Sequence, residues 1–109
     1  MLEEDIVLCG ASCYSKKFYI NDQFESLPQD VKDELKIICV LHTEEVGGTI
    51  QMYFTEDGEL LIKTEANEDD LLYDDIGSGL KVKQYQKEKA ELFEALETYY
   101  RVFFLGEEA

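Results

Sequence analysis

The sequence predicts an α+β fold in which a small antiparallel sheet, built in the order ββ-α-ββ-α, carries two helices packed on one face. Two patterns predict it. Residues 49–66 alternate apolar and polar side chains on both sides of an Asp-Gly turn, which is typical of a β-hairpin. Residues 80–105 repeat apolar side chains at spacings of three and four, which is typical of a helix with one buried face.

Length and composition predict one compact domain. A chain of 109 residues with 45% hydrophobic side chains builds at most a core of two layers. The sequence contains no internal repeat and no linker-like run of glycine and serine. We therefore expect a single domain over 1–109, with charged ends at 1–5 and 106–109 that fray.

Residues 6–20, IVLCGASCYSKKFYI, predict the first two strands. Apolar and small side chains alternate from Val7 to Cys13 and again from Phe18 to Ile20. The Ser-Lys-Lys sequence between these segments is a candidate turn.

The segment ESLPQDVKDELKIICVLHTEEV predicts the first helix. Ser26 and Gln29 have the spacing of a capping box, and Pro28 fits a first turn, where a missing N–H costs little. Gly47 and Gly48 end the helix. Its expected apolar face repeats at helical spacing and comprises Val31, Leu35, Ile37, Ile38, Leu41 and His42.

The register of the hairpin follows from its apolar pattern. A two-residue Asp57-Gly58 loop would place Phe54 opposite Leu61 and mix the two faces of the sheet. A three-residue loop, with Gly58 in the left-handed region, gathers the apolar side chains on one face, so we predict this loop. The expected pairs are Phe54 with Leu60, Met52 with Ile62 and Gln51 with Lys63.

The last helix, expected from about Leu80 to Leu105, is the main candidate for a binding surface. Its simplest role is to cover the sheet. Its C-terminal part, however, carries more large apolar side chains than one small sheet face needs, and such a surplus often marks a self-association surface. We therefore predict a homodimer whose interaction surface consists of Leu92, Leu96, Tyr99, Tyr100, Phe103 and Phe104.

The charge of the chain restricts its partners. Twenty-five acidic and ten basic residues give a net charge of −15, which repels nucleic acids and anionic membrane surfaces. A basic protein partner fits this charge, although the acidic surface is also explained by solubility alone. We predict no nucleic-acid partner, no membrane partner and no cofactor.

The acidic stretch EANEDDLLYDD suggests either a metal site or a solvated crossover between hairpin and helix. Several carboxylates can bind a hard cation, but their spacing does not match a calcium loop. In the crossover interpretation, Leu71, Leu72 and Ile76 are apolar anchors and the following lysines attract the acids. The candidate ligands are Glu68, Asp69, Asp70, Asp74 and Asp75.

The cysteines and the histidine are a second candidate metal set. Three thiolates and one imidazole can bind zinc tetrahedrally, and Cys39 and His42 are spaced to share a helix face. Buried thiols in the core are the simpler interpretation, because free cysteine behaves as a small hydrophobic residue. The candidate zinc ligands are Cys9, Cys13, Cys39 and His42.

Four segments resemble one known family. VLCGASCY, FYINDQFESLPQDVKDELKIICVLHTEEVGG, EDGEL and YDDIGSGLKVKQYQKEKAELFEALETYYRVFF cover most of the chain, which is similar to a family of small acidic bacterial proteins of unknown function. The resemblance implies a free-standing bacterial domain but assigns no catalytic or binding residue. The odd cysteine count and the absence of a signal-peptide pattern favour a cytoplasmic protein.

The functional hypotheses follow from these observations. No catalytic motif is recognised, so no catalytic residue is assigned. The leading hypothesis is a non-enzymatic protein-interaction module that self-associates through its C-terminal helix. The alternative is a metal-binding protein or metal-dependent enzyme that uses either the acidic loop at 65–75 or the cysteine and histidine set.

Overall fold

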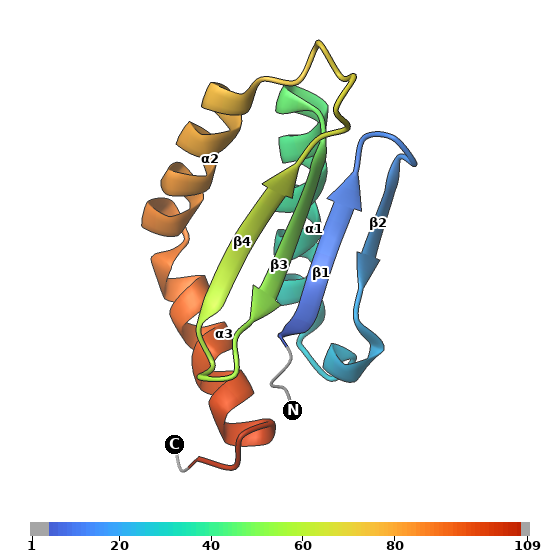
Figure 1. Cartoon of the computed structure of the whole chain (residues 1–109). Coiled ribbons are helices and arrows are strands. Elements are labelled where there is room, and N and C mark those ends of the chain that lie inside the picture. Colours follow the sequence, from blue (N-terminus) through green and yellow to red (C-terminus); the bar gives the residue numbers. More distant parts are fainter. Residues whose placement is uncertain (1–4, 108–109) are drawn as a thin grey trace.

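The computed structural model describes residues 5–107 and confirms the α+β fold class (Figure 1). Residues 1–4 and 108–109, which belong to the ends expected to fray, lie outside the described residues. Within 5–107, four strands and three α-helices follow one another together with a short 3-10 helix. Their bounds are β1 (Ile6–Ser12), β2 (Lys17–Ile20), η1 (Asp22–Phe24), α1 (Gln29–Val46), β3 (Thr49–Phe54), β4 (Leu60–Glu65), α2 (Asp75–Glu88) and α3 (Ala90–Phe103).

The strands form one antiparallel sheet with the order β2-β1-β3-β4. The two strands expected in residues 6–20 are present, and the predicted register of the second hairpin is confirmed. Phe54 lies opposite Leu60 and Met52 opposite Ile62. Gly58 has a φ of 88°, the left-handed conformation that the three-residue loop requires.

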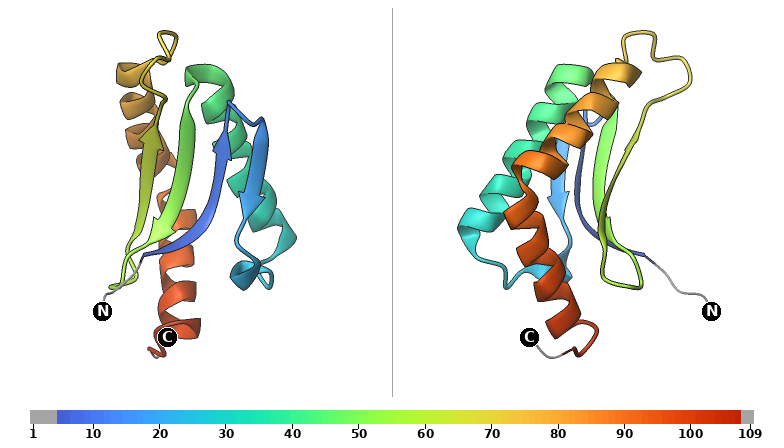
Figure 2. Two further views of the ribbon diagram at one scale, coloured as in Figure 1. Left: turned by 45° about the vertical axis from the view of Figure 1, so that its right-hand side comes forward. Right: turned by 90° about the vertical axis from the view of Figure 1, so that its left-hand side faces the viewer.

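The three α-helices cover one face of this sheet, and the core lies between the two layers (Figure 2). Strands contribute Leu8, Ile50 and Met52 to the core, and α1 contributes Leu35 and Ile38. An aromatic cluster fills the end of the core where α3 meets η1 and β3. Its members are Phe24, Phe54, Tyr99, Tyr100 and Phe104, with ring centroids between 4.3 and 6.4 Å apart.

The start of α1 differs from the prediction. The capping box is wrong, because Pro28 occupies the N-cap position without a side-chain hydrogen bond. The Ser26 hydroxyl instead lies 2.7 Å from the Tyr99 hydroxyl, a partner 73 residues away in sequence. The expected width of the apolar face is also wrong, because Ile37 and Leu41 are 58% and 46% exposed. The predicted end at Val46 is confirmed, since Gly47 follows with a φ of 83°.

The single long helix expected at the C-terminus is two helices. α2 begins at Asp75, earlier than expected, because Asp74 caps it by accepting a hydrogen bond from the Gly77 N–H at 2.9 Å. The helical conformation is interrupted at Lys89, where φ is −108° and ψ is 25°. α2 packs against α1, whereas α3 packs against the sheet. The bend at Lys89 allows both contacts.

None of the helices in residues 5–107 combines the length and the apolar character needed to cross a membrane.

Candidate functional site

The three cysteines occupy two places in the fold. Cys9 on β1 and Cys39 on α1 are fully buried, with their Sγ atoms 3.9 Å apart. The hydrogen bond to Cys39 and burial raise the pKa of the Cys9 thiol, so it stays protonated at neutral pH. Cys13 is half-buried and lies in the turn that follows β1. Its Sγ accepts a hydrogen bond from the Gly48 N–H.

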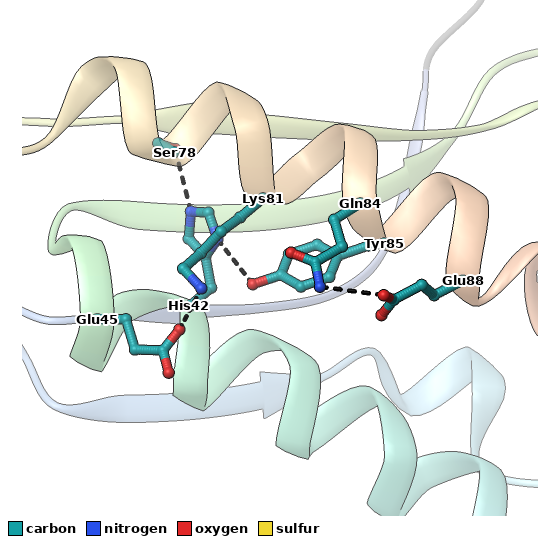
Figure 3. A network of polar contacts seen from close by, with 7 residues as sticks. All are labelled: His42, Glu45, Ser78, Lys81, Gln84, Tyr85 and Glu88. Atoms are coloured by element: carbon teal, nitrogen blue, oxygen red, sulfur yellow. Dashed lines mark hydrogen bonds and ion pairs between the residues drawn. The ribbon is translucent and has the colours of Figure 1, made fainter.

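His42 lies at the joint between α1 and α2, with both ring nitrogens next to hydroxyl groups of α2 (Figure 3). Nε2 is 3.1 Å from the Ser78 Oγ, and Nδ1 is 3.1 Å from the Tyr85 hydroxyl. His42 is fully buried and Ser78 is 1% exposed. A neutral imidazole can donate to one hydroxyl and accept from the other, so this arrangement satisfies all of its polar atoms.

Burial fixes the protonation state of this network. Burial and, to a smaller extent, the Lys81 charge lower the pKa of His42 to about 4, whereas Glu45 acts in the opposite direction. Burial also raises the pKa of Tyr85 to about 12. Lys81 and Glu45 form an ion pair at 2.5 Å beside the network (Figure 3). At neutral pH the three hydrogen-bonding groups are therefore uncharged and hold α1 against α2.

The network resembles part of a nucleophilic site but lacks the access that catalysis needs. A Ser–His pair is activated when a third group orients the histidine, and here the Tyr85 hydroxyl occupies that position. The Ser78 hydroxyl is enclosed between the helices, so a substrate carbonyl cannot reach it in this structure. The geometry supports a structural role for this cluster.

The candidate metal ligands are not gathered into one centre in the described part of the chain. Within residues 5–107, no group of three or more histidine, cysteine, aspartate or glutamate side chains is placed to hold a metal ion. Cys9 and Cys39 come together, whereas His42 directs its nitrogens to α2 and Cys13 contacts Gly48.

Two of the five candidate acidic ligands organise the crossover between β4 and α2. Asp70 accepts hydrogen bonds from the Tyr14 hydroxyl and the Leu72 N–H, and the first of these raises the pKa of Tyr14. Asp74 caps α2. The other candidates are exposed, namely Glu68, Asp69 and Asp75. The crossover interpretation agrees with these contacts, but the lysines that follow do not bind the acids of the loop: Lys81 pairs with Glu45.

The apolar residues of this crossover are not anchors. Leu71 and Leu72 are each 94% exposed, Ile76 is 77% exposed and Leu80 is 63% exposed. Ile76 and Leu80 are spaced by one helical turn and lie opposite the side of α2 that carries Ser78. We call Ile76 and Leu80 the outer α2 face; Leu71 and Leu72 precede α2, and Leu72 lies beside Val46 and Gly47 at the end of α1. An exposed aliphatic surface of this kind is typical of a protein-binding site.

The side chains predicted to form an interface on the C-terminal helix lie mostly in or against the protein's own core. Leu96 and Tyr100 are each 3% exposed, whereas Phe103 is 71% exposed. The remaining three pack partly buried against the core, namely Leu92, Tyr99 and Phe104. Of the C-terminal helical segment, α2 therefore presents more aliphatic side chains to solvent than α3.

Sequence reasoning identified His42 but missed its partners. Ser78 and Tyr85 are spaced by seven residues, or two helical turns, which places them on one face. That spacing is a weak signal, because Ser78 sits between two glycines in GSG and lies before the expected helix start. The sequence predicts only a turn at Lys16 and Lys17, two exposed lysines near Cys13.

The comparisons with known proteins place the chain in a family. The family described as "Family of unknown function (DUF6145)" matches residues 5–108. The chain belongs to this family. Searches of curated proteins and of solved structures gave no match. The expectation of an uncharacterised family is confirmed.

Proposed function

We propose that the protein is a non-enzymatic interaction module that self-associates through the outer α2 face. The observation that carries the proposal is the exposure of Ile76 and Leu80, which are 77% and 63% exposed. Burying one such side chain at an interface is worth about 1.5–3 kcal/mol. Ile76 and Leu80, on neighbouring turns of α2, provide the apolar centre of such an interface.

The charges around this face favour a second copy of the chain as the partner. The loop and the first turn carry exposed Asp69 and Asp75, while the later turns carry exposed Lys83 and Lys87. Within residues 5–107 these two lysines form no ion pair. If two α2 helices pack antiparallel about a two-fold axis, the acidic end of each meets the basic end of the other. The face is then complementary to itself.

The proposal keeps self-association in the C-terminal helical segment but moves it from α3 to α2. In α3, Leu96 and Tyr100 are occupied by the core and cannot also face a partner. The net charge of −15 opposes association of two copies, so the local apolar and charge complementarity has to outweigh that repulsion.

The oligomeric state tests the proposal. Wild-type protein is expected to be a dimer at micromolar concentration by light scattering after size-exclusion chromatography. The double variant Ile76→Ser/Leu80→Ser should be monomeric but still folded, because both side chains are exposed. The matched control is Phe103→Ser, which removes another exposed apolar side chain on α3 and should leave the dimer intact.

A charge exchange tests the antiparallel arrangement. Lys83→Glu/Lys87→Glu and Asp69→Lys/Asp75→Lys should each dimerise more weakly than wild type, because each places like charges against each other. An equimolar mixture of the two variants should restore the dimer, since opposite charges then meet at both ends of the interface.

Other outcomes contradict the proposal. A wild-type protein that is monomeric across micromolar concentrations overturns it, as does a dimer that Phe103→Ser dissociates and Ile76→Ser/Leu80→Ser does not. A monomer that binds a basic protein through this face, more tightly after Lys83→Glu/Lys87→Glu, would make the partner a different chain.

A further inference from the structure

A second surface feature lies on the opposite side of α1 from α2. The end of β1, the turn that follows it, the start of β2 and the middle of α1 enclose a hollow of about 540 Å³. Ligand-binding cavities commonly have volumes of about 300–1,000 Å³. The size therefore suits a small molecule, and the side chains that line the hollow indicate its chemistry.

Three of the ten basic residues of this acidic chain line the hollow, namely Lys16, Lys17 and Lys36. All three are exposed, and within residues 5–107 none of them forms an ion pair. Elsewhere Lys81 and Lys89 do pair, with Glu45 and Glu34. What distinguishes Lys16, Lys17 and Lys36 is that all three line one hollow, where their ammonium groups are available to an external anion.

The local charge of the hollow differs in sign from that of the whole protein. Glu44 is the acidic residue among the lining side chains, so three ammonium groups stand against one carboxylate. The Debye length is about 8 Å at physiological ionic strength, so nearby lysines act on a bound ligand more strongly than distant acids. The three ammonium groups of the lining therefore attract an anion in the hollow more strongly than its one carboxylate repels it.

The backbone at Lys16 adds an independent observation. Lys16 has a φ of 56°, and within residues 5–107 it is the non-glycine residue with a positive φ. Glycine or asparagine adopts this conformation at a lower cost than lysine does. The turn nevertheless carries a lysine there, and its side chain lines the hollow. Strained backbone of this kind is often found where a side chain has to be presented to a ligand.

The remaining lining is apolar with a polar rim. Ala11 is buried, and Phe18 and Val40 are half-buried, so they provide a hydrocarbon surface behind the lysines. The Ser12 hydroxyl accepts hydrogen bonds from the Tyr14 and Ser15 N–H groups, which leaves its own proton free to donate to a ligand. This combination fits a ligand with an anionic head and an apolar body.

We propose that this hollow is a binding site for a small organic anion, with a phosphate or carboxylate head held by Lys16, Lys17 and Lys36 and an apolar body packed on Phe18 and Val40. The site is separate from the outer α2 face, and it holds whether or not the protein self-associates. Cys13 also lines the hollow, so its thiol reports on occupancy.

Phenyl phosphate is a suitable probe, followed by ¹H–¹⁵N NMR on the wild-type protein. Saturable shifts are expected in the amides of residues 11–18 and 40–44. Inorganic phosphate, which lacks the apolar body, and phenol, which lacks the charge, should each bind more weakly. Saturation with phenyl phosphate should also slow the reaction of Cys13 with a thiol reagent.

A matched pair of variants separates the site from general electrostatics. Lys16→Gln/Lys17→Gln/Lys36→Gln should raise the Kd for phenyl phosphate by about 10-fold or more, because charge-assisted contacts are lost. Lys63→Gln/Lys89→Gln/Arg101→Gln removes the same charge away from both the hollow and the outer α2 face and should change the Kd by less than about 2-fold.

Three results would overturn the proposal. The first is the absence of saturable shifts with phenyl phosphate. The second is an equal loss of affinity in the two triple variants, which would mean that only the total charge matters. The third is phenol binding with the same Kd as phenyl phosphate, which would mean that the anionic group does not contribute to binding.

Discussion

α2 and α3 have the same length and follow each other in the chain, yet opposite physical forces hold them in place. α3 buries Phe93, Leu96 and Tyr100 in the core and leaves charged residues outside. α2 buries Ser78 and keeps its large aliphatic side chains, Ile76 and Leu80, in solvent. α3 is therefore fixed by apolar packing, and α2 by hydrogen bonds and ion pairs to α1.

This difference explains why α2 rather than α3 is the candidate interface. Hydrophobic burial contributes more to stability than hydrogen bonds between groups that water also satisfies. α3 has used its apolar surface for the fold, so little remains for a partner. α2 retains an apolar face, and the contacts of His42 with Ser78 and Tyr85 hold its other side.

The largest loss of stability is expected for a substitution in the part of the aromatic cluster that α3 contributes. Tyr100 is 3% exposed, and its ring lies 4.3 Å from that of Phe54. Tyr100→Ala should lower the free energy of unfolding by about 3–5 kcal/mol, because it leaves a cavity between stacked rings. The measurement is the urea midpoint and slope.

Phe103→Ala is the control for this variant, since Phe103 lies on the same helix and is 71% exposed. It should cost less than about 1 kcal/mol. Equal losses in the two variants would contradict the distinction between a buried and an exposed side of α3.

The second expected effect is a loss of stability at acidic pH, caused by His42 at the joint between α1 and α2. The pKa of His42 is lowered to about 4 in the folded protein, against 6.5 in a model peptide. Between these values the unfolded chain binds the proton more readily, so stability falls as pH drops from about 6.5 to 4. The loss attributable to His42 should be about 1–3 kcal/mol.

His42→Gln separates this effect from the titration of the carboxylates, because the variant keeps every acidic residue. Its stability should be lower at pH 7 but should depend less on pH between 6.5 and 4 than that of the wild type. Protection factors, which correct for the slower intrinsic exchange at low pH, should fall in α2 before α3 as the pH falls. Parallel pH curves for the two proteins would show that His42 does not control the joint.

The features that could be predicted from the sequence are those that depend on neighbours along the chain. Alternation of side chains places Phe54 opposite Leu60, because a shift of one residue would send the apolar set into water. The glycine at position 58 supplies the loop conformation. The end of α1 at Gly47 is local in the same sense.

The features that could not be predicted depend on contacts between distant segments. Ser26 has the sequence of a helix cap, but Tyr99 competes for its hydroxyl. No glycine or proline in the sequence predicts the bend at Lys89. The bend follows from the packing of the two helices against different layers. Leu71 and Leu72 look like core residues in the sequence, and only the path of the crossover leaves them in solvent.

The smallest expected effect is a gain in the stability of α2. Gly79 lies in the middle of α2, and a Cβ atom there would have no neighbour within 4 Å. Gly79→Ala should therefore stabilise this helix by about 0.5–1 kcal/mol, because alanine loses less backbone entropy on folding. Gly77→Ala is the control in the same helix, since its Cβ would collide with the Asp74 carboxylate and disturb the cap.

The readout for Gly79→Ala is amide exchange in α2 together with the urea midpoint. If α2 opens on its own while α3 stays packed, the variant should slow exchange in α2 and leave the midpoint nearly unchanged. A rise of the midpoint by the full amount would instead mean that both helices unfold with the core. In that case the polar joint at His42 couples α2 to the sheet as tightly as the aromatic cluster couples α3.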